Sequence, residues 1–195
     1  MKSDIVLAGV GGQGILTIAT ILGAAALQEN LYLKQAEVHG MSQRGGDVQS
    51  NLRLSSRPIH SDLIPLGGAD LIVSLEPMEA LRYLPFLSKQ GWIVTNSVPF
   101  VNIDNYPEMS AIEEELSRHG NVIRFDMEAM AKEVATARSS NLVLLGAASP
   151  FIEIAAEKIE EAIRALFIRK GEKVAESNIA AFRAGRARAL ELKDK

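Results

Sequence analysis

The chain of 195 residues contains no cysteine. Disulfides, thiolate-held iron–sulfur clusters and a cysteine nucleophile are therefore excluded within it. Its three histidines, His39, His60 and His119, lack the spacing of a zinc or iron site, so we expect no metal site in this chain. Any redox centre that the protein uses would have to belong to a partner.

Aromatic residues are also scarce, at 5% of the chain, and the formal net charge is −3. Neither value fits a nucleic-acid binder, which needs base-stacking rings and a clustered basic face. The hydrophobic share of 47% and the charged share of 23% are those of an ordinary soluble globular protein. A chain of this length predicts one domain over residues 1–195.

The uncharged run from residue 5 to 27 is long enough for a membrane helix, and the preceding Met-Lys imitates a secretory signal. A polar, glycine-bearing cluster interrupts it, which consists of Gly9, Gly11, Gly12, Gln13 and Gly14. Each glycine costs a helix interior about 1 kcal/mol relative to alanine. We therefore expect neither a span nor a signal, no membrane contact, and a cytoplasmic location.

The same run predicts a buried strand over 4–10, a tight turn and an apolar helix over 15–30. Gly9, Gly11 and Gly14 have the G-x-G-x-x-G spacing, which suits a tight turn and a close backbone approach. The N–H groups at the start of the helix would attract an anion. The loop at Gly9–Gly14 can therefore be interpreted in two ways, as an anion-binding loop or as a tight turn without a ligand.

A dinucleotide site needs, in addition, an acidic residue about 20 positions further on. Glu37 is the candidate. It fits poorly because residues 31–37 form a weak strand and lead into a polar loop. The motif therefore supports the fold more strongly than it supports a nicotinamide or flavin cofactor.

Strand and helix patterns alternate along the rest of the chain and predict an α/β, Rossmann-like, three-layer fold with a mostly parallel sheet and helices on both faces. Two polar residues are expected to cap helices, Ser110 and Ser177. The expected strands are 47–55, 68–74, one from residue 92, and 121–126. One expected helix starts near Pro77. The other expected helices cover 109–120, 127–137, 139–149, 150–171 and the C-terminal segment.

A second glycine-bearing loop supplies further candidate ligand contacts, Ser42, Gln43, Arg44 and Gly45. Its exposed donors and its permanent positive charge suit an anion. His39 beside it is either a proton carrier or a histidine bonded to the backbone.

Glu76 and Asn96 follow two predicted parallel strands, where ligand clefts form in such folds. The alternatives are a carboxylate at a helix start for Glu76 and turn formation for Asn96. Asn141 is either a ligand contact or a helix cap.

Three segments together resemble the gamma-type subunits of 2-oxoacid:ferredoxin oxidoreductases, and most strongly the small (beta) subunit of indolepyruvate:ferredoxin oxidoreductase. They are "GVGGQG" at 9–14, "EVHGMSQRGGDVQSNLRL" at 37–54 and "GADLIVSLEPMEALRYLPFL" at 68–87. The resemblance continues in "NLVLLGA" and "NIAAFRAG" and so covers nearly the whole chain. Residues 1–195 are accordingly expected to be one pyruvate/ketoisovalerate (2-oxoacid) oxidoreductase gamma-type domain.

The resemblance implies an oxidative decarboxylation, in which an arylpyruvate and coenzyme A give an aryl-acetyl-CoA, carbon dioxide and reduced ferredoxin. It places thiamine diphosphate, Mg and the iron–sulfur clusters in a large partner subunit. It also suggests a part in coenzyme A handling at the interface. For the backbone donors from Gly11 to Gly14 and the side chains of Gln43 and Arg44, two uses stay open: accepting the phosphates of coenzyme A, or docking against the thiamine-bearing subunit.

The isolated chain is therefore expected to be inactive, to bind no cofactor alone, and to be able to form a homodimer. Its catalytic residues stay unknown. The alternative is a stand-alone nucleotide-dependent oxidoreductase that uses the G-x-G-x-x-G loop.

Overall fold

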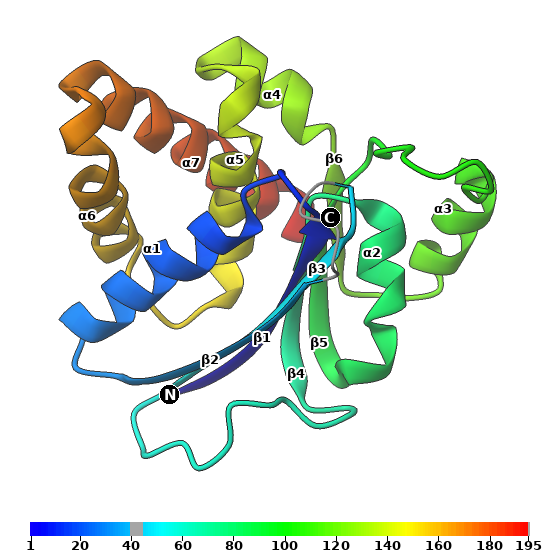
Figure 1. Ribbon diagram of the computed structural model, residues 1–195, viewed down its shortest axis with the longest axis horizontal. Helices are drawn as coiled ribbons and strands as arrows, with labels where there is room; N and C mark the ends of the chain where they lie inside the picture. The colour runs from blue at the N-terminus through cyan, green and yellow to red at the C-terminus, as the bar shows by residue number, and fades with distance from the viewer. Residues whose placement is uncertain (40–44, 195) are drawn as a thin grey trace.

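A six-stranded sheet of order β2-β3-β1-β4-β5-β6 crosses the computed structural model of the protein (Figure 1). The structure describes residues 1–39 and 45–194. Its strands are β1 (Lys2–Val10), β2 (Tyr32–His39), β3 (Asp47–Ser55), β4 (Ala69–Ser74), β5 (Leu87–Asn96) and β6 (Val122–Phe125). Strands β1, β4, β5 and β6 run parallel, whereas β3 is antiparallel to both β1 and β2. The predicted α/β fold with a mostly parallel sheet is confirmed.

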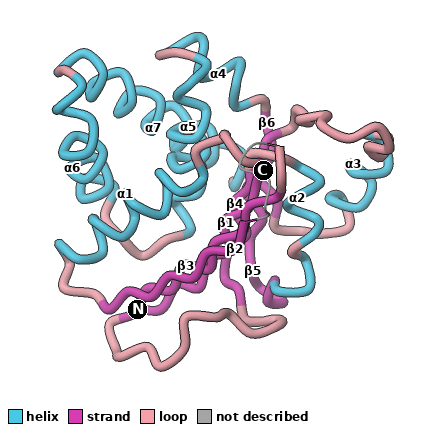
Figure 2. Tube along the Cα trace, viewed as in Figure 1, coloured by secondary structure: helices cyan, strands magenta, loops and turns pink. Residues whose placement is uncertain are grey.

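Helices cover both faces of this sheet, as Figures 1 and 2 show, with α2 and α3 on one side and α1, α5, α6 and α7 on the other. The helices are α1 (Ile15–Gln28), α2 (Pro77–Arg82), α3 (Met109–Ser117), α4 (Met127–Val134), α5 (Ser140–Ala148), α6 (Ala156–Phe167) and α7 (Glu172–Lys193). Short 3₁₀ turns are η1 (Leu84–Phe86), η2 (Ala137–Ser139), η3 (Ser149–Phe151) and η4 (Ile168–Lys170). None of the helices in the described part of the chain has the length and hydropathy needed to cross a membrane.

Strand β1 shows why the first apolar run folds as a buried strand. Successive side chains of a strand point to opposite faces. Ile5 and Leu7 pack into the core shared with α1, α5, α6 and α7, whereas Val6 and Ala8 pack into the core under α2 and α3. All four side chains are fully buried. A continuous apolar run is therefore what a central strand of a three-layer fold requires.

Helices α5 and α7 approach each other closely through two glycines. A Cβ atom built on Gly146 would lie 1.9 Å from the carbonyl oxygen of Phe182, and one built on Gly185 would lie 2.0 Å from the carbonyl oxygen of Val143. The two backbones are thus in direct contact, which only residues without a Cβ allow. This contact fixes the place of the C-terminal helix against the buried helix α5.

Several element ends differ from the sequence predictions. Ser110 lies in the first turn of α3, after Glu108 at the N-cap, and Ser177 lies inside α7, which begins five residues earlier after Gly171. Strand β5 begins at Leu87 rather than at residue 92. The helix predicted over 150–171 begins only at Ala156, because residues 149–151 form a 3₁₀ turn. Serine often caps a helix, but it also occurs inside helices, as Ser110 and Ser177 do here. A serine in the sequence therefore does not by itself locate a helix end.

Candidate functional site

The two glycine-bearing loops of the sequence meet at the carboxyl end of β1. The N–H of Gly11 donates to the carbonyl oxygen of Gly46 at 2.8 Å, and the N–H of Gly45 reaches the carbonyl oxygen of Gly11 at 3.4 Å. The chain after β1 and the chain before β3 are therefore joined backbone to backbone. Three other predicted contacts, Ser42, Gln43 and Arg44, lie outside the described residues.

The first loop is held in a conformation that glycine favours. Gly12 has a φ of 104° and Gly14 a φ of 79°, a region that side chains rarely adopt. Gly9 is needed for space, since a Cβ there would lie 2.8 Å from the side-chain oxygen of Gln13. That oxygen accepts the N–H of Val10 at 2.8 Å. The side chain of Gln13, predicted to contact a ligand, thus braces the loop by binding its own backbone.

Some backbone N–H groups of this loop are available to bind an anion, as far as the described residues show. Gly14 is the N-cap of α1 and provides no side-chain cap, and no acidic residue stands in the first turn of that helix. Among the described residues, the N–H groups of Gly12 and Gly14 have no acceptor. In the described part of the chain, no atom lies within 4 Å of a Cβ built on Gly12. A helix start with free N–H groups favours phosphate or carboxylate binding.

Glu76 follows β4 at the same edge of the sheet and is fully buried. Its carboxylate accepts the N–H of Glu79 at 2.8 Å, which caps α2, and the N–H of Phe100 at 3.4 Å. It also accepts the hydroxyl of Tyr106. Three internal donors therefore hold this carboxylate, and it fastens the segment after β5 to the start of α2.

Asn96, at the end of β5, is 3% exposed and is also bonded internally. Its amide nitrogen donates to the carbonyl oxygen of Val98 at 3.1 Å, and its oxygen accepts the N–H of Met127 at 3.0 Å. Asn96 and Glu76 thus both hold the loops at the sheet edge in place, and both residues are buried.

The segment 97–108 reaches back to the glycine loops. The side-chain nitrogen of Asn102 donates to the carbonyl oxygen of Gly45 at 2.5 Å. Apolar side chains on this segment face solvent, with exposed fractions from 38% to 67%; they are Val98, Phe100, Val101 and Ile103. The carboxyl edge of the sheet thus combines an exposed apolar loop with backbone donors that have no acceptor among the described residues.

Two tyrosines beside this edge have perturbed acidity. Burial, followed by the hydrogen bond to Glu76, raises the pKa of Tyr106. Burial, followed by the negative charges of Asp47 and Glu79, raises the pKa of Tyr83 to about 12. Both phenols are therefore protonated at neutral pH, and neither is available there as a phenolate base.

The acid that a dinucleotide site would use is poorly placed. Glu37 lies on the edge strand β2 and pairs with Ser50 of β3, which separates β2 from β1. Two strand spacings, roughly 10 Å, therefore lie between β2 and the strand that carries the glycine loop. The carboxylate is exposed and accepts the side-chain N–H of Gln35 at 2.5 Å.

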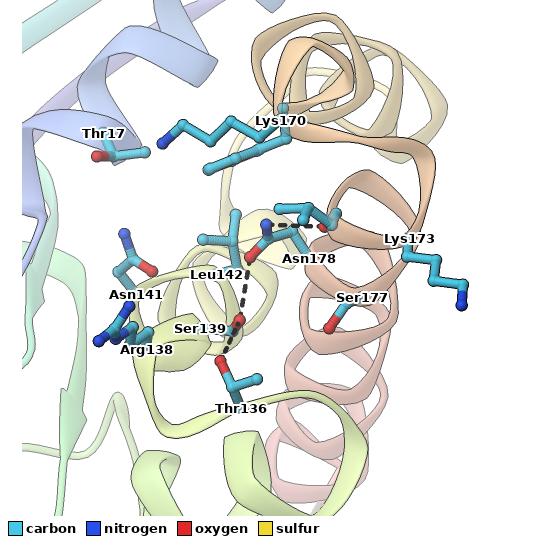
Figure 3. A pocket seen from close by; sticks show the side chains of 12 residues that line it. Thr17, Thr136, Arg138, Ser139, Asn141, Leu142, Lys170, Lys173, Ser177 and Asn178 are labelled. Carbon is cyan, nitrogen blue, oxygen red and sulfur yellow. Dashed lines mark hydrogen bonds between the residues drawn. The ribbon is translucent and has the colours of Figure 1, made fainter.

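Asn141 is the residue whose place the sequence did not settle. It is not the N-cap of α5, which is Ser139. Its side-chain nitrogen donates to the carbonyl oxygen of Gly14 at 3.2 Å, across 127 positions of sequence. It therefore supports the glycine loop from behind and lines a pocket of about 560 Å³ between α1, α5 and α7 (Figure 3). Sequence reasoning missed this pocket, since its walls come from three separate segments.

No group of three or more His, Asp or Glu side chains in the described ranges could hold a metal ion. The backbone amides at Gly12 and Gly14 are the donors that suit a phosphate group of a ligand. What this edge of the sheet offers chemically is thus anion binding and apolar contact.

The family model and the similar proteins point to the same group of enzymes. A family model described as pyruvate ferredoxin/flavodoxin oxidoreductase matches residues 4–188. The chain is 40% identical over 200 residues to the indolepyruvate oxidoreductase subunit IorB of Thermococcus kodakarensis. That alignment covers 97% of this chain and 96% of the relative.

Solved structures share the fold. The gamma subunit of a keto/oxoacid ferredoxin oxidoreductase from Geobacter sulfurreducens superimposes with a TM-score of 0.70 at 24% identity, over 97% of this chain and 99% of that one. A 2-oxoglutarate:ferredoxin oxidoreductase from Magnetococcus marinus, solved with 2-oxoglutarate, coenzyme A and succinyl-CoA bound, gives a TM-score of 0.78 at 24% identity. It covers all of this chain but only 32% of that longer one. At these identities the likeness establishes the common fold.

Proposed function

The chain belongs to the pyruvate ferredoxin/flavodoxin oxidoreductase family, and from this premise we propose that it is the small, gamma-type subunit of an indolepyruvate:ferredoxin oxidoreductase. The observation that carries the proposal is the 40% identity, over nearly the full length of both proteins, to an indolepyruvate oxidoreductase subunit. In this proposal residues 1–195 form one gamma-type domain, and the chain works as part of a larger enzyme.

The proposed reaction joins an arylpyruvate to coenzyme A. The bond between the carboxyl and oxo carbons breaks, carbon dioxide leaves, the remaining acyl group forms a thioester with coenzyme A, and the released electrons pass to ferredoxin. Thiamine diphosphate, Mg and the iron–sulfur clusters belong to the large partner subunit. The absence of cysteine from this chain supports that division, because thiolates are the usual cluster ligands.

In this proposal the glycine loop faces the partner and handles coenzyme A. The donors expected from the sequence are the N–H groups from Gly11 to Gly14, together with Gln43 and Arg44. The N–H groups of Gly11 and Gln13 already donate to the carbonyl oxygens of Gly46 and Val10, so the proposed backbone donors are those of Gly12 and Gly14. Within residues 1–39 and 45–194, the N–H groups of Gly12 and Gly14 have no acceptor and nothing lies beside Gly12, which supports a phosphate at this place. The thioester chemistry is supplied by coenzyme A, and this chain binds and orients its anionic part.

The exposed apolar segment supports a docking role for the same edge. Phe100 is 46% exposed and Val101 67% exposed, although Glu76 and Asn102 hold their segment in one place. Ordered apolar side chains in solvent are a common mark of a protein interface. We propose that the large subunit covers them, and that a homodimer forms through this face when the partner is absent.

The stand-alone nucleotide-dependent oxidoreductase is not supported. The relatives are subunits of 2-oxoacid oxidoreductases. Glu37, which would have to hold a ribose, lies on the far side of β3 from the glycine loop.

A pull-down of the tagged chain from its native host tests the proposal. We expect a large partner in the eluate that carries iron and thiamine diphosphate. We also expect the eluate to reduce a redox dye when indolepyruvate and coenzyme A are both added, faster than with pyruvate or 2-oxoglutarate. A chain that is recovered alone, or a complex that prefers 2-oxoglutarate, would contradict the assignment.

A further inference from the structure

The pocket behind the glycine loop is a candidate binding site of its own. It encloses about 560 Å³, which is within the usual range for small-molecule sites. Its walls are the first turn of α1, the junction of η2 with α5, and the junction of η4 with α7, as Figure 3 shows. Its lining includes Thr17, Arg138, Asn141, Phe167, Lys170 and Asn178.

The lining is positively charged. Arg138, Lys170 and Lys173 contribute to it, and no lining residue is acidic. Among the described residues, none of the three cations lies within ion-pair distance of a carboxylate. Figure 3 shows Lys170 extending toward Thr17 and Lys173 pointing away from the pocket. Arg138 and Lys170 are exposed residues that line the pocket, and the Lys170 ammonium lies 5.4 Å from the centre of the Phe167 ring. Two cations without a carboxylate partner favour an anionic ligand at this place.

One buried polar atom in the pocket has no partner. Asn141 is 7% exposed, and its side-chain nitrogen is committed to the carbonyl oxygen of Gly14. That bond fixes the orientation of the amide, because the acceptor is a carbonyl oxygen. The side-chain oxygen of Asn141 is then left without any hydrogen-bond donor in the described part of the chain. Buried acceptors of this kind are rare and call for an explanation.

The neighbouring polar groups do not share this deficit. The hydroxyl of Ser139 donates to the side-chain oxygen of Asn178 at 3.0 Å, and the side-chain nitrogen of Asn178 donates to the carbonyl oxygen of Val174 at 3.0 Å (Figure 3). Ser139 and Asn178 thus have hydrogen-bond partners, whereas the side-chain oxygen of Asn141 has no donor among the described residues.

We propose that this pocket binds an organic phosphate that carries a hydrogen-bond donor, of the class of the nucleoside monophosphates. The phosphate lies between Arg138 and Lys170, since both cations suit its oxygens. A hydroxyl or amino group of the ligand donates to the side-chain oxygen of Asn141. The flat apolar part packs against Phe167 and Leu142, which line the same pocket.

The site is distinct from the free N–H groups of the glycine loop, yet it is coupled to them. Asn141 contacts the ligand on one side and Gly14 on the other. A ligand that holds Asn141 therefore also stabilises the conformation of Gly14, where a Cβ would lie only 2.7 Å from the Asn141 amide nitrogen. This inference does not rest on the proposed enzyme, because the isolated full-length chain carries every residue involved.

Isothermal titration calorimetry of the full-length chain with AMP tests the site, with adenosine and inorganic phosphate as partial ligands. We expect AMP to bind at one site and each partial ligand to bind at least tenfold more weakly. Lys170→Glu and Arg138→Glu should each weaken AMP binding at least tenfold. Lys89→Glu is the matched control, because it makes the same charge change at an exposed position outside the pocket and should leave binding within twofold.

Amide chemical shifts locate the ligand independently. AMP should shift the backbone and side-chain amide signals of Asn141 and the backbone signals of Thr17 and Asn178. The inference is overturned if AMP does not bind, or if it binds with the same affinity to Lys170→Glu and Arg138→Glu. It is also overturned if inorganic phosphate binds as tightly as AMP, which would indicate a simple anion site.

Discussion

Replacing Gly146 by alanine should destabilise the protein strongly, because this glycine lies where α5 touches α7. The new Cβ would stand 1.9 Å from the carbonyl oxygen of Phe182, 2.8 Å from its carbonyl carbon and 2.9 Å from the backbone nitrogen of Arg186. All three are backbone atoms, so no side-chain rotation relieves the contact. Normal separation needs a shift of more than 1 Å between two helices of the close-packed core.

The cost follows from the range for overpacked cores, which is roughly 1–3 kcal/mol and occasionally more. We expect about 3 kcal/mol, since a whole helix must move. For a protein of this size that corresponds to a fall of roughly 6–12 °C in Tm. The shift should also loosen the pocket, whose walls include parts of both helices.

Gly120→Ala is the matched control, because no described residue lies within 4 Å of its built Cβ and its φ is not in the left-handed region. It should keep or slightly raise the Tm, by restricting the unfolded chain. Thermal unfolding followed by circular dichroism measures both variants. The reasoning is refuted if Gly146→Ala melts within about 1 °C of the parent, or if Gly120→Ala falls as far.

Three further perturbations test other parts of the structure. Glu76→Ala removes the cap of α2 and leaves the hydroxyl of Tyr106 without its partner; we expect a loss of about 3 kcal/mol in urea unfolding and a smaller loss for Glu76→Gln. Arg53→Met removes both hydrogen bonds to the buried carboxylate of Asp4, at 2.7 and 3.0 Å. It should cost about 3 kcal/mol in the same assay, whereas a loss below about 1 kcal/mol would show that Lys2 alone compensates the charge. Folding raises the pKa of Tyr83 to about 12, so the unfolded chain ionises first, and stability should fall as the pH rises from about 10 to 12. Urea midpoints across that range should fall less steeply for Tyr83→Phe, and equal slopes would contradict the assigned cause.

Much of the fold was predictable from residue patterns. The run at 4–10 is apolar on both faces, and only a central strand in a three-layer fold buries both faces. The G-x-G-x-x-G spacing located the turn into α1 correctly, because Gly14 has a left-handed conformation that other residues avoid. Helix ends were less predictable, since Ser110 and Ser177 are polar residues that the tertiary structure places inside helices.

The candidate site was predictable only where the signal was local. Glycine spacing indicated the loop at 9–14, whereas its contact with Gly45 and Gly46 depends on β3 lying beside β1 in antiparallel orientation. Glu76 and Asn96 were expected at the sheet edge and do lie there, yet their side chains are bonded internally. The pocket beside Asn141 joins segments more than 100 positions apart, and no pattern along the chain indicates such a contact.

The central claim is that this chain is a necessary subunit of an indolepyruvate oxidoreductase. Its most direct test is reconstitution, in which the purified large subunit is assayed for dye reduction with indolepyruvate and coenzyme A, with and without this chain. We expect that neither component turns over alone, and that the mixture regains activity that saturates at a fixed ratio of the two chains. Full activity of the large subunit alone, or no gain on adding this chain to a competent preparation, would contradict it.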